Sequence, residues 1–383
     1  MNIALVIERF DPLRGGRETS TAQIAEELSR RGHTVTVLCQ QGRTDLEFAE
    51  VLPLGRTGFS RTGRLQTFIE QVELTLAGRS FDIVHSMLPV PGADVYQLRG
   101  GTVPGQREAA LRQSGPIELA VRKVTDRLNF HRAAMGALET QVISDPETLC
   151  LPVSEMIQRE LVEHYGRTDG VRTIYNAVDL PDISPEKRRE LREQKRAELH
   201  VGPDDLIFLT LATNLELKGI EHAITSFGQW RRLQPEYGKS RLVIVGKDSP
   251  IVYERWADRK ECRFFVDFIP PTPDVWPYYA AADVVMLLSW YDPCSRVVLE
   301  ATRWGIPSIT TVCNGASEIL HGAGCVVQSP SRVDEVVNSM ALLSDASLRA
   351  EWSEKLLTFS DELAMTRHVD QLEEAYKEVP GRS

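Results

Sequence analysis

The stretch Asp292-Pro-Cys-Ser-Arg-Val-Val-Leu-Glu300-Ala-Thr-Arg-Trp-Gly-Ile-Pro307 combines a short loop with the first turns of a predicted helix. It follows the apolar run 283–289, which has the pattern of a buried strand. Ser295 is a suitable N-cap for the helix, and Gly305 and Pro307 are typical of its end. Strand, loop and helix in this order form the repeating unit of proteins with parallel sheets. The stretch therefore predicts an α/β fold.

The same unit predicts an anion-binding site. A helix N-terminus directs unpaired N–H groups and the positive end of its dipole at a ligand. Asp292 and Glu300 add a carboxylate on each side of this terminus. Acidic residues at helix starts also occur simply because they stabilise the dipole, so the segment alone leaves both interpretations open. A ligand that is part polyol and part phosphate, such as a nucleotide-sugar, fits the arrangement.

Apolar runs alternate with amphipathic stretches along the whole chain. In the first half, 3–7 has the pattern of a strand and 19–31 that of a helix. A second series begins at 206–212, after a strongly charged helix over 185–199 that we expect to be a solvated face. At 383 residues the chain exceeds what one core usually supports. The pattern predicts two Rossmann-like, doubly wound domains that meet near Asp179.

Composition narrows the class of protein. The chain is 42% hydrophobic and 26% charged, and its net charge of −10 argues against a nucleic-acid binder. No apolar run approaches membrane-spanning length, and the segment 1–7 is expected to be a first strand, not a signal peptide. Six cysteines without CxxC spacing predict reduced thiols and a cytoplasmic protein. The chain has no Asp-x-Asp triad and no histidine ligand spacing, so we expect no metal and no cofactor.

Four motifs in the right order resemble those of retaining glycosyltransferases with two Rossmann-like domains facing a central cleft, the GT-B fold. The run from Asp292 to Glu300 is similar to the E-x7-E motif of that family, with aspartate in the first acidic place. A further segment resembles the lipopolysaccharide-core glucosyltransferases in particular. The remaining motifs are a strand, loop and helix end (268–271 and 276–283), a phosphate-binding lysine loop (213–219), a glycine-rich first loop (10–16) and the lipopolysaccharide-type segment (91–96).

The resemblance implies a division of labour between the domains. Residues 1–178 would form the acceptor-side domain, completed by a C-terminal helix of about 365–383. Residues 179–364 would bind the nucleotide-sugar. The first 178 residues carry 20 Lys and Arg against 22 Asp and Glu, and the remainder carries 24 against 32. The acceptor side is thus the less acidic half, which fits an anionic acceptor without requiring one.

The resemblance also implies roles for individual residues. Lys218, Asp292 and Arg99 are the expected catalytic residues: Lys218 would neutralise the diphosphate and Asp292 would contact sugar hydroxyls. Arg99 stands where many relatives have a histidine, so it either binds an acceptor phosphate or marks a lost contact. Glu300 would bind the ribose hydroxyls. The residues expected to contact the donor are Gly15, Gly16, Asn214, Lys218, Ile269, Asp292, Cys294, Ser295, Arg296, Val297, Val298 and Glu300.

Three of the expected site residues depart from the family pattern: Asp292, Arg99 and Asn214. Asn214 replaces an arginine that many relatives pair with the lysine, and Arg296 is a candidate to supply the missing charge. Backbone groups near Ile269 would contact the base. Gly15 and Gly16 would allow close approach of the backbone to the diphosphate or the acceptor.

Three segments of the first half are expected at the ligand-binding edge or on the surface. Two segments, 56–64 and 100–115, are expected to be loops at the ligand-binding edge. A basic amphipathic stretch either docks on an anionic bilayer or lipid-linked glycan, at the inner face of the membrane, or is an ordinary surface helix. Its basic residues are Arg122, Lys123, Arg127 and Arg132.

The sequence therefore predicts a retaining, metal-independent hexosyltransferase. UDP-glucose is the leading donor and a lipopolysaccharide or other cell-surface glycan the leading acceptor, both by resemblance. Two alternatives stay open: a non-catalytic sugar-nucleotide-binding protein, favoured by Asn214, Arg99 and Asp292, and a nucleotide-sugar epimerase on the same fold.

Overall fold

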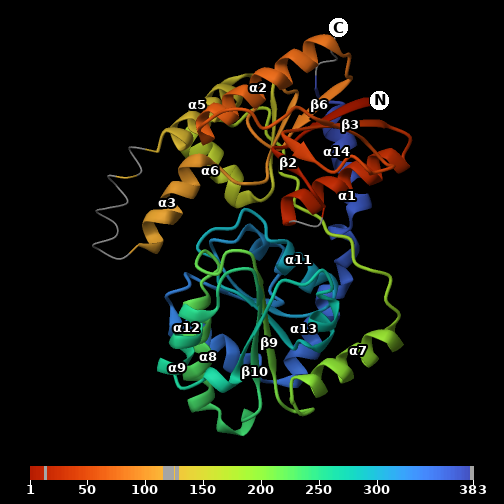
Figure 1. Ribbon diagram of the computed structural model, residues 1–383. Coiled ribbons are helices and arrows are strands. Elements are labelled where there is room, and N and C mark those ends of the chain that lie inside the picture. The colour runs from red at the N-terminus through yellow and green to blue at the C-terminus, as the bar shows by residue number, and fades with distance from the viewer. Residues whose placement is uncertain (13–14, 115–124, 126–128, 380–383) are drawn as a thin grey trace. The chain divides into compact units, whose positions relative to one another are not determined.

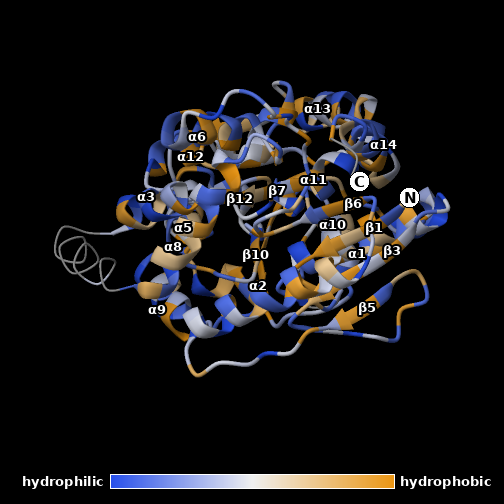
Figure 2. Cartoon of the chain, turned by 90° about the horizontal axis from the view of Figure 1, so that it is seen from above, coloured by the Kyte–Doolittle hydropathy of each residue, from blue (hydrophilic) through white to orange (hydrophobic). Residues whose placement is uncertain are grey.

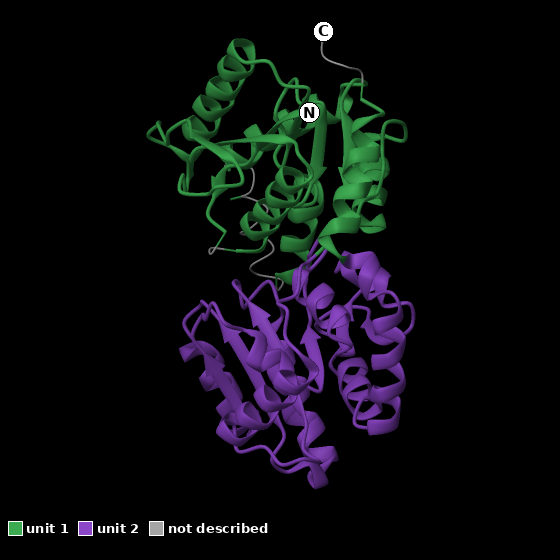
Figure 3. Cartoon of the chain, turned by 90° about the vertical axis from the view of Figure 1, so that its right-hand side faces the viewer, with its two compact units in different colours: residues 1–177, 364–383 green, residues 178–363 purple. Residues whose placement is uncertain are grey.

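The computed structural model describes residues 1–12, 15–114, 125 and 129–379, which divide into two compact units. Unit 1 comprises residues 1–177 and 364–383, and unit 2 comprises residues 178–363 (Figure 3). The limits expected from the sequence differ from these by a single residue. Each unit is described by itself below.

Unit 1 contains a six-stranded parallel sheet with the strand order β5-β3-β1-β6-β7-β8. The strands β2 and β4 form a separate two-stranded parallel sheet. Its elements are β1 (Asn2–Val6), β2 (Arg9–Phe10), α1 (Gly16–Arg30), β3 (Thr34–Cys39), β4 (Gln41–Gly42), β5 (Glu50–Pro53), α2 (Arg61–Gly78), β6 (Ile83–Ser86), β7 (Val95–Leu98), α3 (Val103–Gln113), α5 (Phe130–Ser144), β8 (Leu149–Pro152), α6 (Glu155–Tyr165) and α14 (Met365–Tyr376).

Unit 2 contains a second six-stranded parallel sheet with the order β11-β10-β9-β12-β13-β14. Its elements are α7 (Pro185–Glu198), β9 (Ile207–Ala212), α8 (Ile220–Leu233), η1 (Pro235–Tyr237), β10 (Arg241–Gly246), α9 (Ile251–Arg259), η2 (Arg263–Phe265), β11 (Val266–Ile269), α10 (Trp276–Ala281), β12 (Val284–Leu287), α11 (Arg296–Arg303), β13 (Ser308–Thr311), η3 (Gly315–Leu320), β14 (Gly324–Val327), α12 (Val333–Leu342), α13 (Ala346–Thr358) and η4 (Ser360–Leu363).

Both sheets are buried on their two faces, which explains why their strands are almost continuously apolar. β1, for example, is buried from Ile3 to Val6. Figure 2 shows mostly hydrophobic strands next to helices in which hydrophobic and hydrophilic residues mix. The two sheets share one topology, in which the strand order reverses between β1 and β6 in unit 1 and between β9 and β12 in unit 2. Ligands of open α/β sheets bind beyond the carboxyl ends of the strands at such a switch point.

The C-terminal helix α14 completes unit 1, as the sequence predicted for the end of the chain. It is drawn in blue among the red elements of the N-terminal half in Figure 1. Arg31, at the end of α1, donates to Asp370 (2.6 Å) and to Glu373 (2.7 Å) of α14. The hydroxyl of Tyr376 lies 2.8 Å from Nδ1 of His85 in β6. α14 thereby covers one face of the first sheet.

Three sequence expectations about local structure are wrong. Residues 61–64 are the first turn of α2, not a loop, because Ser60 caps the helix by accepting from the Gly63 N–H (2.9 Å). The predicted loop 100–115 contains helix α3, capped by Thr102. Helix α7 is not simply a solvated face either. Arg192 and Arg196 both bind the buried carboxylate of Asp283, at 2.6 and 2.8 Å.

Within the described residues, no helix combines the length and the hydropathy of a membrane-spanning segment.

Candidate active site

Two loops of unit 2 meet at the switch point of the second sheet. The first follows β9 and carries Lys218, and the second follows β12 and carries Asp292. The Lys218 ammonium and the Asp292 carboxylate form an ion pair, with side chains 17% and 13% exposed. The loops are also joined through their backbones, because the Trp290 N–H donates to the carbonyl of Leu217 (2.9 Å). The structure thus brings both predicted catalytic residues of this unit together.

The turn that presents Lys218 has a defined shape. The Asn214 side chain accepts a hydrogen bond from the Leu217 N–H (2.9 Å), and the Lys218 N–H donates to the Asn214 carbonyl (3.2 Å). Gly219 follows with φ +65°, and a Cβ there would lie 2.2 Å from the carbonyl oxygen of Leu288. Asn214 therefore shapes the turn, which is a role that an arginine side chain would not supply.

The loop that presents Asp292 is held by a residue that the sequence reasoning missed. Asn314, fully buried after β13, accepts from the backbone N–H groups of Ser295 (3.2 Å) and Ala316 (3.1 Å). The backbone of Asp292 pairs with the same segment, donating to Cys313 (2.9 Å) and accepting from Gly315 (2.9 Å). Asn314 thus fixes the distance between the acidic loop and the helix that follows.

The hydrogen bond from the Ser295 N–H to Asn314 corrects one detail of the predicted contacts with the nucleotide-sugar. The Ser295 N–H is directed at Asn314 and not outward, and the Ser295 side chain makes no capping hydrogen bond although it occupies the N-cap of α11. Val297 and Val298 lie in the first turn, where backbone N–H groups have no acceptor within the helix. Cys294 and Val298 are buried, so their side chains belong to the packing of the unit.

Glu300 lies one turn further along α11 and is held in place by two donors. The hydroxyl of the fully buried Tyr279 donates to one carboxylate oxygen (2.7 Å), and Arg296 donates to the other (3.3 Å). Burial first, and the Glu300 charge second, raise the pKa of Tyr279 well above its usual range. Tyr279 therefore stays a donor, and Arg296 is paired with Glu300 in this structure rather than placed beside Lys218.

A pocket of about 230 Å³ lies beyond the carboxyl ends of β10 and β11. The predicted base-contact residue Ile269 ends β11 and lines it, together with Leu215 from the Lys218 turn. A Cβ on Gly246 would lie 2.8 Å from both Leu215 and the Ala212 carbonyl, so this position requires glycine. The pocket is mainly apolar, with these other lining residues: Ile244, Lys247, Asp248, Ser249, Pro250, Phe268, Pro270 and Pro271. An apolar pocket of this size suits a small organic group such as a heterocycle.

The remaining predicted residues belong to unit 1. Gly15 is the N-cap of α1 and Gly16 its first residue. The φ of Gly15, 178°, is extended backbone that any residue adopts, so its conformation does not require glycine. The Thr19 hydroxyl donates to the Pro12 carbonyl (2.7 Å), which links Pro12 to the first turn of α1.

Arg99 follows β7 and is only 6% exposed. It lies in a buried polar group with Gln97, His85 and His368. Burial above all, with the nearby Arg99 charge second, lowers the pKa of both histidines to about 3. Both imidazoles are therefore neutral, and Arg99 is part of the packing of α14 against the first sheet.

Two further expectations concern the predicted basic stretch and metal binding. Arg122, Lys123 and Arg127 of the predicted basic stretch lie outside the described residues. Arg132 is in the first turn of α5, where its N–H donates to the cap residue Asn129 (3.0 Å). Among the residues that the structure describes, no three His, Cys, Asp or Glu side chains converge on a common point.

The chain has the GT-B fold, and comparison with family models identifies it as a glycosyltransferase. Residues 192–358 match the family model of glycosyl transferases group 1, and residues 14–105 match the model of glycosyltransferase family 4. Residues 192–358 thus form a glycosyl transferases group 1 domain, and the chain is a glycosyltransferase enzyme. The match to the group 1 model covers the Lys218 turn, the pocket lined by Ile269 and helix α11.

Particular relatives align over nearly the full length. The lipopolysaccharide glucosyltransferase WaaG of Escherichia coli (strain K12) is 24% identical over 377 residues, 94% of each chain. A crystal structure of WaaG superimposes with a TM-score of 0.80 at 21% identity, over 99% of this chain and 100% of the other. The structure of Anabaena HepE in complex with UDP-glucose gives a TM-score of 0.74 at 17% identity, over 99% and 100% of the two chains.

Proposed function

We propose that this glycosyltransferase transfers glucose from UDP-glucose, with retention of configuration and without a metal ion, to a lipopolysaccharide or similar cell-surface glycan. It would act in the cytoplasm, at the inner face of the membrane. The observation that carries the proposal is the ion pair between Lys218 and Asp292 across the β9/β12 switch point, beside the N-terminus of α11.

Each part of the donor has a matching partner in unit 2. Lys218 and the first N–H groups of α11 stabilise the diphosphate as negative charge builds up on it. The Glu300 carboxylate, oriented by Tyr279, accepts from the ribose hydroxyls. The pocket beside Ile269 receives the base.

Asp292 accepts from hydroxyls of the hexose once Lys218 turns to the diphosphate. Because no divalent ion is needed when a lysine and a helix N-terminus supply the positive charge, the reaction runs without metal. The proposal for glucose is supported by the names of the relatives, which include a glucosyltransferase and a complex with UDP-glucose.

The transfer step balances without a protein base. The bond between the anomeric carbon and the donor phosphate oxygen breaks while the acceptor oxygen bonds to the same carbon on the same face. The acceptor proton passes to the departing phosphate oxygen. UDP leaves with the proton, and the sugar keeps its configuration.

The test is a transfer assay on purified protein in the presence of EDTA. UDP-glucose, UDP-galactose, ADP-glucose and GDP-mannose are compared with a truncated lipopolysaccharide acceptor, and the anomeric configuration is read by NMR. We expect UDP-glucose to be preferred and Lys218→Ala to reduce transfer by roughly a hundredfold or more. Lys239→Ala removes an exposed lysine of the same unit and should change nothing.

The two alternatives give different results in this assay. UDP binding without turnover on any acceptor would identify a non-catalytic binder. Conversion of the sugar without transfer to an acceptor would identify an epimerase. Loss of activity with EDTA, restored by a divalent ion, would contradict the metal-free mechanism.

A further inference from the structure

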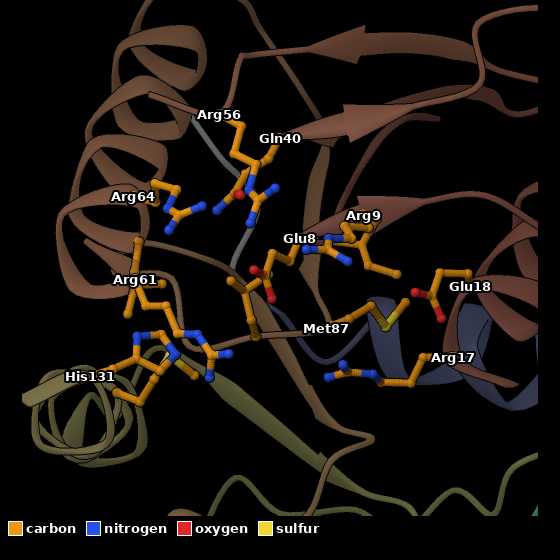
Figure 4. Close-up of a pocket in the computed structure, with 14 residues that line it drawn as sticks. Glu8, Arg9, Arg17, Glu18, Gln40, Arg56, Arg61, Arg64, Met87 and His131 are labelled. Carbon is orange, nitrogen blue, oxygen red and sulfur yellow. The ribbon is translucent and has the colours of Figure 1, made fainter. Parts of the chain in front are cut away.

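Unit 1 contains a cavity of about 390 Å³ that none of the predicted site residues lines. Figure 4 shows its side chains converging from several elements. The volume lies within the usual range for pockets that bind small molecules. Its lining residues are Ile7, Glu8, Arg9, Arg17, Glu18, Gln40, Arg56, Arg61, Arg64, Leu65, Met87, Leu88, His131 and Met135.

The cavity lies where the first sheet should bind a ligand. Ile7 and Glu8 directly follow β1, Gln40 follows β3, and Met87 follows β6. The strand order of unit 1 reverses between β1 and β6, so the cavity lies beyond the carboxyl ends of the strands at the switch point. The Lys218 and Asp292 loops occupy the equivalent position of the second sheet.

Five arginines and two glutamates surround the cavity, which gives an excess of positive charge. Within the described part of the chain, none of the five arginines makes an ion pair. Other arginines of the unit do pair: Arg43 with Asp45 (2.6 Å) and Arg79 with Glu50 (2.8 Å). Guanidinium groups that outnumber the carboxylates around them repel one another, and an anion that accepts their planar donors removes that cost.

The arginines are arranged to share one ligand. In Figure 4, Arg56 and Arg64 extend toward Gln40, and Arg61 lies beside His131. Arg61 and Arg64 share one face of the first turn of α2. Nε of Arg64 donates a hydrogen bond to the Ser60 carbonyl (3.2 Å).

Two further polar groups at this cavity have no partner in the described residues. Gln40 is 3% exposed, and no hydrogen bond holds its side-chain amide. Nδ1 of His131 is buried without a hydrogen-bond partner. Buried polar groups without partners are costly, so a bound polar ligand that satisfies them is favoured.

The two glutamates of the cavity indicate which groups the ligand carries besides the anion. Glu8 and Glu18 line the same cavity as the arginines. A carboxylate accepts hydrogen bonds from sugar hydroxyls but repels phosphate. The combination suits a molecule with one strongly anionic group and several hydroxyls.

We propose that this cavity binds a phosphorylated sugar residue of the acceptor, with the phosphate on Arg56, Arg61 and Arg64 and the hydroxyls on Glu8 and Glu18. This deepens the proposed function and rests on it for the link to transfer. A phosphate monoester carries up to two charges and three acceptor oxygens, which matches several guanidinium forks better than a single carboxylate does.

The experiment measures binding directly, so that it needs no turnover. Calorimetric titration compares glucose 6-phosphate, glucuronate, glucose and inorganic phosphate on the wild-type chain and on Arg61→Gln/Arg64→Gln. We expect glucose 6-phosphate to bind best on the wild type and at least tenfold more weakly on the double variant. Arg79→Gln, which removes an arginine of unit 1 that is already paired with Glu50, is the matched control and should bind like the wild type.

Each other outcome overturns the inference in a recognisable way. Equal binding of glucose 6-phosphate to wild type and double variant would exclude the arginines as its site. Tighter binding of glucuronate would assign the cavity to a carboxylate, and binding of inorganic phosphate alone would exclude a sugar.

UDP titrated on the same variants separates the two proposals. An unchanged UDP affinity leaves the donor site intact, whereas a parallel loss of UDP would assign the arginines to the donor diphosphate.

Thermal unfolding of the double variant checks that it folds. Arg61 is exposed and Arg64 half-buried, so a folded variant is expected. Should the pair prove unstable, Arg56→Gln, an exposed loop residue, repeats the comparison on its own.

Discussion

Lys218 and Asp292 neutralise each other across the switch point of the second sheet. Under the proposed function, Asp292 competes with the donor diphosphate for the same ammonium group. The donor would then displace this carboxylate, which would turn to the sugar, so that the pair would link diphosphate binding to the placement of a sugar-binding acid.

Asp292→Asn separates these two effects. Removing the competing carboxylate should tighten UDP binding by about tenfold, since one charge at this range is worth on the order of 1–2 kcal/mol. Transfer of the hexose should nevertheless fall by roughly tenfold to a hundredfold, because the sugar hydroxyls would donate to a neutral amide oxygen in place of a charged carboxylate. Calorimetry and transfer kinetics measure the two changes. Asp274→Asn, an exposed acid of the same unit, is the control, and weaker UDP binding in Asp292→Asn would refute the competition.

Tyr279 is expected to act as a positioning residue for Glu300. Tyr279→Phe removes the 2.7 Å hydrogen bond and leaves the carboxylate held by Arg296 alone. We expect the UDP affinity to fall by about three- to tenfold, with pyrophosphate binding unchanged because it has no ribose. Tyr278→Phe alters a neighbouring tyrosine that does not contact Glu300 and serves as the control. A parallel loss of pyrophosphate binding would point to a general disturbance of α11.

The sequence located the part of this site that is contiguous in the chain. Lys218, Asp292 and Glu300 each lie in one strand–loop–helix unit, so residue order alone placed them at the same edge of the sheet. Asn314 and Tyr279 were missed because they reach the site from other loops and helices, through a register that only the folded sheet defines.

The sequence placed the segment 56–64 at the ligand-binding edge, but it did not predict that the arginines of this segment line one cavity. The segment 56–64 looked like a loop because it contains Gly58 and Gly63, yet Ser60 starts a helix within it. Its arginines approach β1 and β6 only after the chain has folded. Arg192 and Arg196 were similarly assigned to solvent, since nothing in the charged run 185–199 indicates its buried partner Asp283.

Gly219 should be required for the shape of the lysine turn. Gly219→Ala combines a left-handed φ of +65° with a contact of 2.2 Å to the Leu288 carbonyl, so the turn must move away from β12. We expect a loss of stability well beyond the roughly 1–2 kcal/mol of the left-handed conformation alone, together with weaker UDP binding. Gly166→Ala is the matched control, because Gly166 also has φ +65° but its Cβ would meet nothing within 4 Å. Equal melting temperatures for the two variants would show that the close contact is relieved at no cost.

The buried histidines of unit 1 should make its stability depend on pH. Burial, with the Arg99 charge, lowers the pKa of His85 and His368 to about 3, whereas an unfolded histidine titrates near pH 6.5. The groups facing them, Tyr376 and the Tyr175 carbonyl, carry no negative charge to offset this. Their contribution to stability is therefore complete above about pH 6.5 and declines as the pH falls toward 3. The decline is about 1.4 kcal/mol per pH unit for each histidine.

Urea unfolding at pH 7.5 and pH 5.5 measures this dependence. Between these values the two histidines should account for about 2–3 kcal/mol of the lost free energy of unfolding, because only the unfolded chain takes up their protons. His85→Gln/His368→Gln, which cannot titrate there, should lose correspondingly less on acidification, even though it starts from a lower stability. His200→Asn removes an exposed histidine at a left-handed position that asparagine tolerates, and it should keep the full pH dependence. If the double variant instead lost as much free energy as the wild type, the acid sensitivity would have to come from carboxylates elsewhere in the chain.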